Sequence, residues 1–196
     1  MPGFVVSLNG KFLVAVSTEG LNVLSVRVHG DLISPEFALI YVSGGHYGDE
    51  TNNKHLIWLN DQEIGPGDEV EVEFREETST STPGKTIEEL YPDDVPKMGP
   101  WQSIEEIFKD LAKKPKVREK FVFQVEPPST EAINSCTEPN DHSFGFSILW
   151  DWTRPNDARV SLSSNTLDSI ERRQDGTEHA RFRLQFGQRV NLRVSA

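Results

Sequence analysis

Residues Gly67-Asp-Glu-Val-Glu-Val-Glu-Phe-Arg75 decide the fold class, because charged and apolar side chains alternate along them. In an extended chain Val70, Val72 and Phe74 lie on one face, and the glutamates between them lie on the other. A strand of this kind covers a core with one face and meets water with the other, as antiparallel strands commonly do. Gly65-Pro66 just before it are typical turn residues. The stretch therefore predicts an antiparallel, half-solvated sheet.

The same strand character extends through most of the 196 residues. Asn9-Gly10 is a strong signal for a two-residue hairpin turn near the start of the chain. We expect six strands in the first part of the chain and five in the last. They are residues 4–8, 12–16, 23–29, 37–42, 55–59 and 70–74, then 121–125, 144–149, 158–162, 181–184 and 190–194.

The segment between these two parts differs in composition. Residues 78–84 are rich in Ser and Thr and have no periodic apolar face, which predicts an exposed connector. Ser103 and Glu106 have the spacing of a capping box, and apolar residues then recur at helical spacing up to Pro115. This predicts a helix near residues 103–113. Thr86 with Glu89 has the same spacing and predicts a helix of one or two turns.

The two strand-rich parts also resemble each other. One matching pair of segments is His55–Trp58 and His179–Phe182. Each is followed by a second matching segment, Gly67–Phe74 in the first part and Gly187–Val194 in the last. Residues 38–43 also match residues 158–163. Unrelated hairpins can show the same alternation, so independent halves are the alternative. We expect a mainly β fold of two related antiparallel units, sandwich or barrel-like, packed into one body. The units are residues 1–77 and 121–196, and residues 78–120 form the helical connector.

Charge and composition exclude several functions. The chain carries 31 acidic and 20 basic residues, a formal charge of −11, which opposes nonspecific binding to nucleic acid. Residues 1–75 hold 11 of the acids and only 4 of the bases. No apolar run approaches the roughly 20 residues of a membrane helix. The single cysteine, Cys136, cannot form a disulfide within the chain, so we expect a cytoplasmic protein.

Catalytic and metal-binding patterns are missing. The five histidines do not have the spacing of metal ligands. Cys136 lies near the acidic residues Glu138 and Asp141, whose negative charges favour the neutral thiol over the nucleophilic thiolate. Pro83-Gly-Lys-Thr86 resembles the end of a phosphate-binding loop but lacks the glycine five residues upstream. We therefore expect no catalytic residue, no metal and no cofactor.

The candidate binding residues follow the aromatic run Phe144–Trp152. Its alternate residues share one face of an extended strand, so burial in the core explains most of them. Trp150 and Trp152 followed by Arg154 would form a binding anchor if they lie beyond the edge of the sheet. Asp141 and His142 precede the run and complete the set.

A resemblance covers most of the chain. Pro83–Leu90, Phe144–Trp150, Val160–Leu162 and the closing Gly-x-x-Val pattern of each half resemble a group of uncharacterised bacterial proteins of about 200 residues. That group has no established activity, so the resemblance implies no catalytic residue. The first unit also resembles short bacterial proteins thought to accompany secreted toxins.

The leading functional hypothesis is a noncatalytic protein-binding module, immunity-like or an adaptor, whose acidic first half recognises a basic partner protein. The alternative is a binder or hydrolase of a small molecule or carbohydrate, with a cleft between the units near Trp150, Trp152 and His142. Self-association through an exposed sheet edge is a third possibility.

Overall fold

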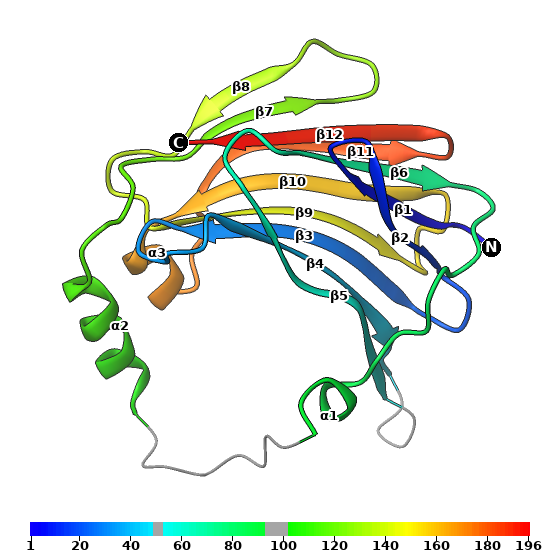
Figure 1. Ribbon diagram of the computed structural model, residues 1–196, viewed down its shortest axis with the longest axis horizontal. Coiled ribbons are helices and arrows are strands. Elements are labelled where there is room, and N and C mark those ends of the chain that lie inside the picture. Colours follow the sequence, from blue (N-terminus) through cyan, green and yellow to red (C-terminus); the bar gives the residue numbers. More distant parts are fainter. Residues whose placement is uncertain (49–52, 93–101) are drawn as a thin grey trace.

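The computed structural model describes residues 1–48, 53–92 and 102–196. They form two six-stranded antiparallel sheets that pack face to face as an open sandwich (Figure 1). The mainly β fold class and its short helical connector are therefore confirmed, and the sandwich is the form that it takes. Residues 93–101 of the connector lie outside the described residues.

Each sheet is named here by its strands in spatial order. Sheet A contains β2 (Lys11–Ser17), β1 (Gly3–Leu8), β6 (Glu69–Arg75), β12 (Gln188–Ser195), β7 (Val122–Glu126) and β8 (Ile133–Cys136). Sheet B contains β11 (Thr177–Gln185), β10 (Asp157–Asn165), β9 (Ser143–Asp151), β3 (Val23–Asp31), β4 (Ala38–His46) and β5 (Lys54–Ile64). The sequence predicted all of these strands except the four-residue β8.

The strand order has a twofold relation between the halves of the chain. Each half contributes three strands to each sheet, and exchanging β1–β6 with β7–β12 leaves both orders unchanged. The halves meet where β3 pairs with β9 and where β6 pairs with β12. In each sheet the three strands of one half are neighbours, and the contacts between the sheets join β2 to β5 and β8 to β11. Each half therefore has a layer in both sheets, and the two halves lie side by side.

The strand register gives this twofold relation a numerical form. The Cα partner of Arg27 is Ser147 in the β3–β9 ladder, and the partner of Glu71 is Asn191 in the β6–β12 ladder. Both pairs are separated by 120 residues, the offset that also aligns residues 38–43 with 158–163. A pseudo-twofold axis therefore passes through these two pairs, which is the arrangement that an internal duplication predicts.

Two buried threonines repeat the same local contact. The Thr18 amide and hydroxyl both donate to the carbonyl of Pro2, just before β1. Thr137 donates its amide to the carbonyl of Phe121, just before β7, and its hydroxyl accepts the Phe121 amide at 3.0 Å. Each threonine thus closes the first hairpin of its half with its polar atoms satisfied, as burial requires.

The core lies between the sheets and follows the alternation in the sequence. Val70, Val72 and Phe74 of β6 are buried as predicted, and they join one continuous apolar cluster. The largest fully buried side chains come from both halves: Phe4, Phe74, Phe121, Phe123, Phe146, Leu24, Leu32, Ile40, Ile148, Leu162, Leu184 and Leu192. Burial of this apolar area is the main favourable contribution to folding.

The Ser/Thr-rich connector is less free than its composition suggests. Ser81 donates its amide to the carbonyl of Ala15 at 2.9 Å, and the Thr80 hydroxyl accepts the amide of Ser17 at 3.0 Å. Further on, Lys85 forms a β-bridge with Ile57 of β5. The segment thus satisfies backbone groups on an edge strand of each sheet, which limits pairing with another chain.

The three helices are short. α1 (Ile87–Leu90) and α2 (Ile104–Lys113) begin at Thr86 and Ser103, and each has the predicted capping box. α3 (Leu167–Glu171), which the sequence did not predict, follows β10 and contacts α2. Within the described residues, none of the helices has the length and apolar character needed to cross a membrane.

The packing of the sheets yields a first prediction. Ile148 of β9 is fully buried between Val26 and Val160 of its neighbouring strands. We expect Ile148→Ala to lower the free energy of unfolding by about 2–5 kcal/mol, because it leaves a cavity in the core. Ile170→Ala in α3, where the side chain is 41% exposed, should change it by less than about 0.5 kcal/mol. Urea titrations measure both, and equal effects would contradict this account of the core.

Candidate functional site

The outward face of sheet B contains a groove. Its volume is about 570 Å³, which is within the range of ligand sites. Sheet B is bowed, and α1 and α2 lie beyond its open face (Figure 1). Five neighbouring strands line the groove with Arg27, Val28, His29, Tyr41, Asp61, Gly145, Phe146, Ser147, Ser161 and Ser163.

A row of polar side chains crosses these strands. Arg27 pairs with Tyr41 on one side and with Ser147 on the other, and Ser147 pairs with Ser161. The two serine hydroxyls are 2.9 Å apart and share a hydrogen bond. Alternation along each strand explains the row, because the residues on either side of each member point into the core. The row spans both halves of the chain and contains the pair on the pseudo-twofold axis.

Asp61 ends this row on β5. The register of β4 with β5 is irregular around Tyr41, and Asp61 has a positive φ of 49° there. Such an irregularity redirects side chains at the margin of a sheet. Burial, and next the negative charge of Asp61, raise the pKa of the Tyr41 phenol. The Tyr41 hydroxyl therefore stays protonated and can donate a hydrogen bond.

The two halves contribute differently to the groove. The twofold relation pairs each residue of β3 and β4 with the residue 120 positions later. It therefore matches Arg27 with Ser147, Tyr41 with Ser161, and Ser43 with Ser163. Serines thus replace an arginine and a tyrosine on the β9–β10 side. Gly145 lies beside them, and a Cβ atom added to it would meet nothing within 4 Å. The first half supplies the large polar side chains of the groove. The second half supplies short serine side chains, whose hydroxyl groups form the bottom of the groove, called its floor below.

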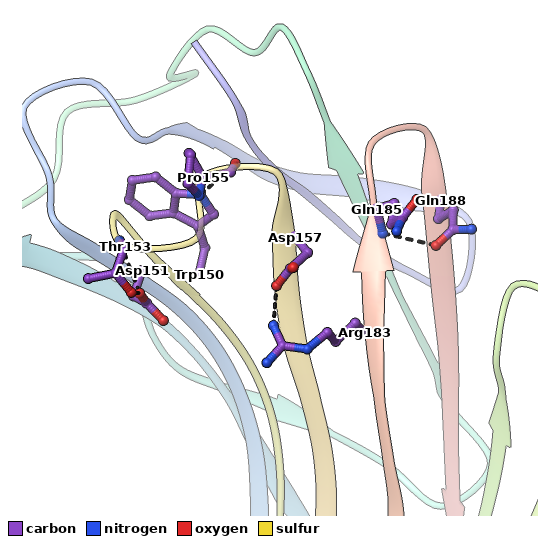
Figure 2. Close-up of polar contacts among 8 residues, drawn as sticks. All are labelled: Trp150, Asp151, Thr153, Pro155, Asp157, Arg183, Gln185 and Gln188. Atoms are coloured by element: carbon purple, nitrogen blue, oxygen red, sulfur yellow. Dashed lines mark hydrogen bonds and ion pairs between the residues drawn. The ribbon is translucent and has the colours of Figure 1, made fainter.

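Trp150, which the sequence placed in a possible anchor, belongs to the core. Its side chain is 4% exposed, and its indole N–H donates to the carbonyl of Pro155 at 3.1 Å. Figure 2 shows the ring held inside the turn between β9 and β10, near the ion pair of Asp157 with Arg183. The alternative of a buried aromatic side chain therefore describes Trp150.

The other predicted site residues lie apart from each other. β9 ends at Asp151, so Trp152 leaves the strand face and is 65% exposed in the turn, together with Arg154. Asp141 and His142 precede the opposite end of β9, a nine-residue strand about 27 Å long. The structure thus brings Asp141 beside His142, and Trp152 near Arg154, but does not bring these two pairs together.

Asp141 belongs to a buried polar chain. Its carboxylate accepts hydrogen bonds from the amide of Glu138 at 2.7 Å and from the hydroxyl of Ser164. The Ser164 oxygen lies 2.8 Å from Nε2 of His179. A serine between a carboxylate and an imidazole has the composition of a catalytic triad, but Ser164 is fully buried and sits in the middle of the chain. These contacts tie the loop before β9 to β10 and β11.

A smaller cavity of about 310 Å³ lies beside Asp141 and His142, where α2 and α3 meet the sheets. Lys116 lines it, but its ammonium donates to the carbonyls of Pro139 and Asp141 at 3.0 and 2.9 Å. The cation is therefore engaged in holding the loop. This cavity contains two of the predicted residues and neither tryptophan.

The acidic strand β6 is largely paired within the molecule. Glu69 lies 2.8 Å from Arg193, and Glu71 lies 3.3 Å from Arg189, both on the neighbouring β12. Glu73 pairs with Arg75 at 2.7 Å. Surface pairs of this kind add little stability, but they reduce the net charge of the outward face of sheet A. The charge excess of the first half is therefore partly compensated by the second.

Metal and acid–base chemistry have little support in this geometry. Within the described residues, no group of three His, Cys, Asp or Glu side chains could hold a metal ion. Asp61 is the single carboxylate that lines the groove there. Glycoside hydrolysis by the common mechanisms needs two carboxylates on either side of the bond.

Comparison with known proteins identifies no relative. No protein-family model, no curated protein and no solved structure matches this chain. The resemblances drawn from short motifs therefore gain no support, and the function rests on the geometry.

Sequence reasoning missed the groove residues. Arg27 and Tyr41 each look like an ordinary outward residue of a half-solvated strand. One signal in the sequence could have indicated them. The residues 120 positions later, at the equivalent places in the second half, are both serine, so large side chains in the first half correspond to small ones in the second. That substitution pattern points to a site only when β3 is known to lie beside β9.

Burial of histidines yields a pH prediction. Burial lowers the pKa of His179 and of His142 from the ordinary 6.5. The unfolded chain then binds protons more readily than the folded one, so stability is full above about pH 6.5 and falls as the pH drops below it. We expect the free energy of unfolding to fall between pH 7 and pH 5, and His179→Gln to make this fall shallower. Urea titrations across that range test it, and an unchanged slope in the variant would contradict it.

Proposed function

We propose that this protein is a noncatalytic binding protein that holds a polyhydroxylated ligand of the carbohydrate class across the open face of sheet B. The observation that carries the proposal is the groove itself, with hydroxyl groups on its floor and large polar side chains on one side. It crosses five strands, a distance of about 19 Å, which suits an extended oligosaccharide.

The chemistry of the lining supports this ligand class. A sugar presents many hydroxyl groups, each of which donates and accepts hydrogen bonds. Serine hydroxyls can do both, whereas Arg27 only donates and an ionised Asp61 only accepts. Tyr41 adds an aromatic face on which the C–H surface of a sugar ring can pack. A groove with these groups recognises a ligand that is polar along its whole length.

Recognition of a basic partner protein by the acidic first half stays a second prediction. The cross-strand pairs of Glu69 with Arg193 and of Glu71 with Arg189 leave less free charge for a partner than the sequence suggests. We therefore rank it behind the groove. A cytoplasmic location also stays a prediction, which rests on the lone Cys136.

Filling the groove tests the proposal. Ser161→Tyr introduces the side chain that Tyr41 presents at the equivalent position of the first half, so the strand should accept it. We expect an array of neutral and acidic oligosaccharides to identify a ligand of the wild-type protein. Ser161→Tyr should then weaken its binding at least about tenfold in titration calorimetry, because the new ring occupies the floor.

Gln124→Tyr is the matched control. Gln124 faces outward on β7 of sheet A, far from the groove, and should leave affinity unchanged. Unfolding midpoints of both variants confirm that they fold. Failure of the wild-type protein to bind any saccharide, or unchanged affinity in Ser161→Tyr, would overturn the proposal.

A further inference from the structure

The arginine at the centre of the groove differs from most arginines on the strands. Five strand arginines pair with carboxylates of the same protein: Arg75, Arg181, Arg183, Arg189 and Arg193. Arg27, in contrast, forms no ion pair with any residue that the structure describes. Its exposed side chain lines the groove beside Tyr41 and Ser147. A guanidinium group in this position is available to an anionic ligand.

The neighbours of Arg27 strengthen this assignment. His29 is the next outward residue on β3, and its Cα partner on β9 is Gly145, above which the groove is open. The Tyr41 and Ser147 hydroxyls flank Arg27 and can donate hydrogen bonds. The carboxylate of Asp61 lies beyond Tyr41, two strands from Arg27. Donors therefore gather at the centre of the groove, and the acceptor lies at one end.

This division gives the groove a direction. An anionic group fits at Arg27 and His29, where a planar guanidinium can form two parallel hydrogen bonds with a carboxylate. A hydroxyl group of the same ligand fits at Asp61, which accepts. The formal charge of −11 on the whole chain opposes the approach of a polyanion. A ligand with one carboxylate among many hydroxyls meets all three conditions.

We infer that the ligand is an acidic saccharide, a uronic-acid-containing oligosaccharide whose carboxylate binds Arg27. This inference rests on the proposed function of the groove and names the ligand class more narrowly. It distinguishes the site from one for neutral sugars, and it assigns Arg27 as the residue that determines specificity.

The experiment compares two probes that differ only at the charged group. One is an oligosaccharide that contains glucuronic acid, and the other has glucose in its place. We expect the wild-type protein to bind the acidic probe at least about tenfold more tightly, because only this probe has a carboxylate that can form two charge-assisted hydrogen bonds with Arg27. In Arg27→Gln this preference should fall to less than about twofold, because most of the lost affinity falls on the acidic probe.

Arg159→Gln is the matched control. Arg159 is also exposed on sheet B and also forms no ion pair within the described residues, but it lies outside the groove lining. It should keep the wild-type preference for the acidic probe. Equal affinity of the wild-type protein for the two probes, both lost in Ser161→Tyr, would overturn the inference and leave the proposed function standing. Absence of binding to the acidic probe would overturn the inference, and absence of binding to any saccharide of the array would overturn both.

Discussion

The structure depends on two strand pairings at the pseudo-twofold axis, β3 with β9 and β6 with β12. Each half of the chain supplies only three strands to a sheet, so without the other half β3 and β6, or β9 and β12, would each have an unpaired edge. Joining the halves along these two ladders completes both layers at once. The continuous core between the sheets is the result, and it contains large side chains from both halves.

The same pairing creates the groove. The β3–β9 ladder brings the large polar residues of the first half beside the serines and glycine of the second. If the second half carried the same side chains as the first, an arginine and a tyrosine would occupy the positions of Ser147 and Ser161 and fill the groove. The hollow therefore comes from the difference in side chains between two halves that share one strand order. The core that maintains the fold is thus separate from the outward side chains that form the groove.

Much of the fold could be predicted from the sequence, because alternation and turn residues act locally. Val70, Val72 and Phe74 are buried, and the capping boxes at Thr86 and Ser103 begin helices as expected. The short β8 was missed because four residues carry too little periodicity. The site was harder to predict, because it depends on which strands are neighbours. Trp150 illustrates the difficulty: its strand face was correctly inferred, yet whether that face met the core or a ligand needed the structure.

The position of β12 in sheet A has a consequence for synthesis on the ribosome. β12 lies between β6 and β7, so sheet A consists of two separate pieces until residues 188–195 have left the exit tunnel. During that interval β6 and β7 each present an unpaired edge, and the connector residues that bond to β2 do not reach them. A nascent chain in this state is exposed to misassembly with its neighbours on a polysome, and sheet A becomes continuous only when β12 inserts.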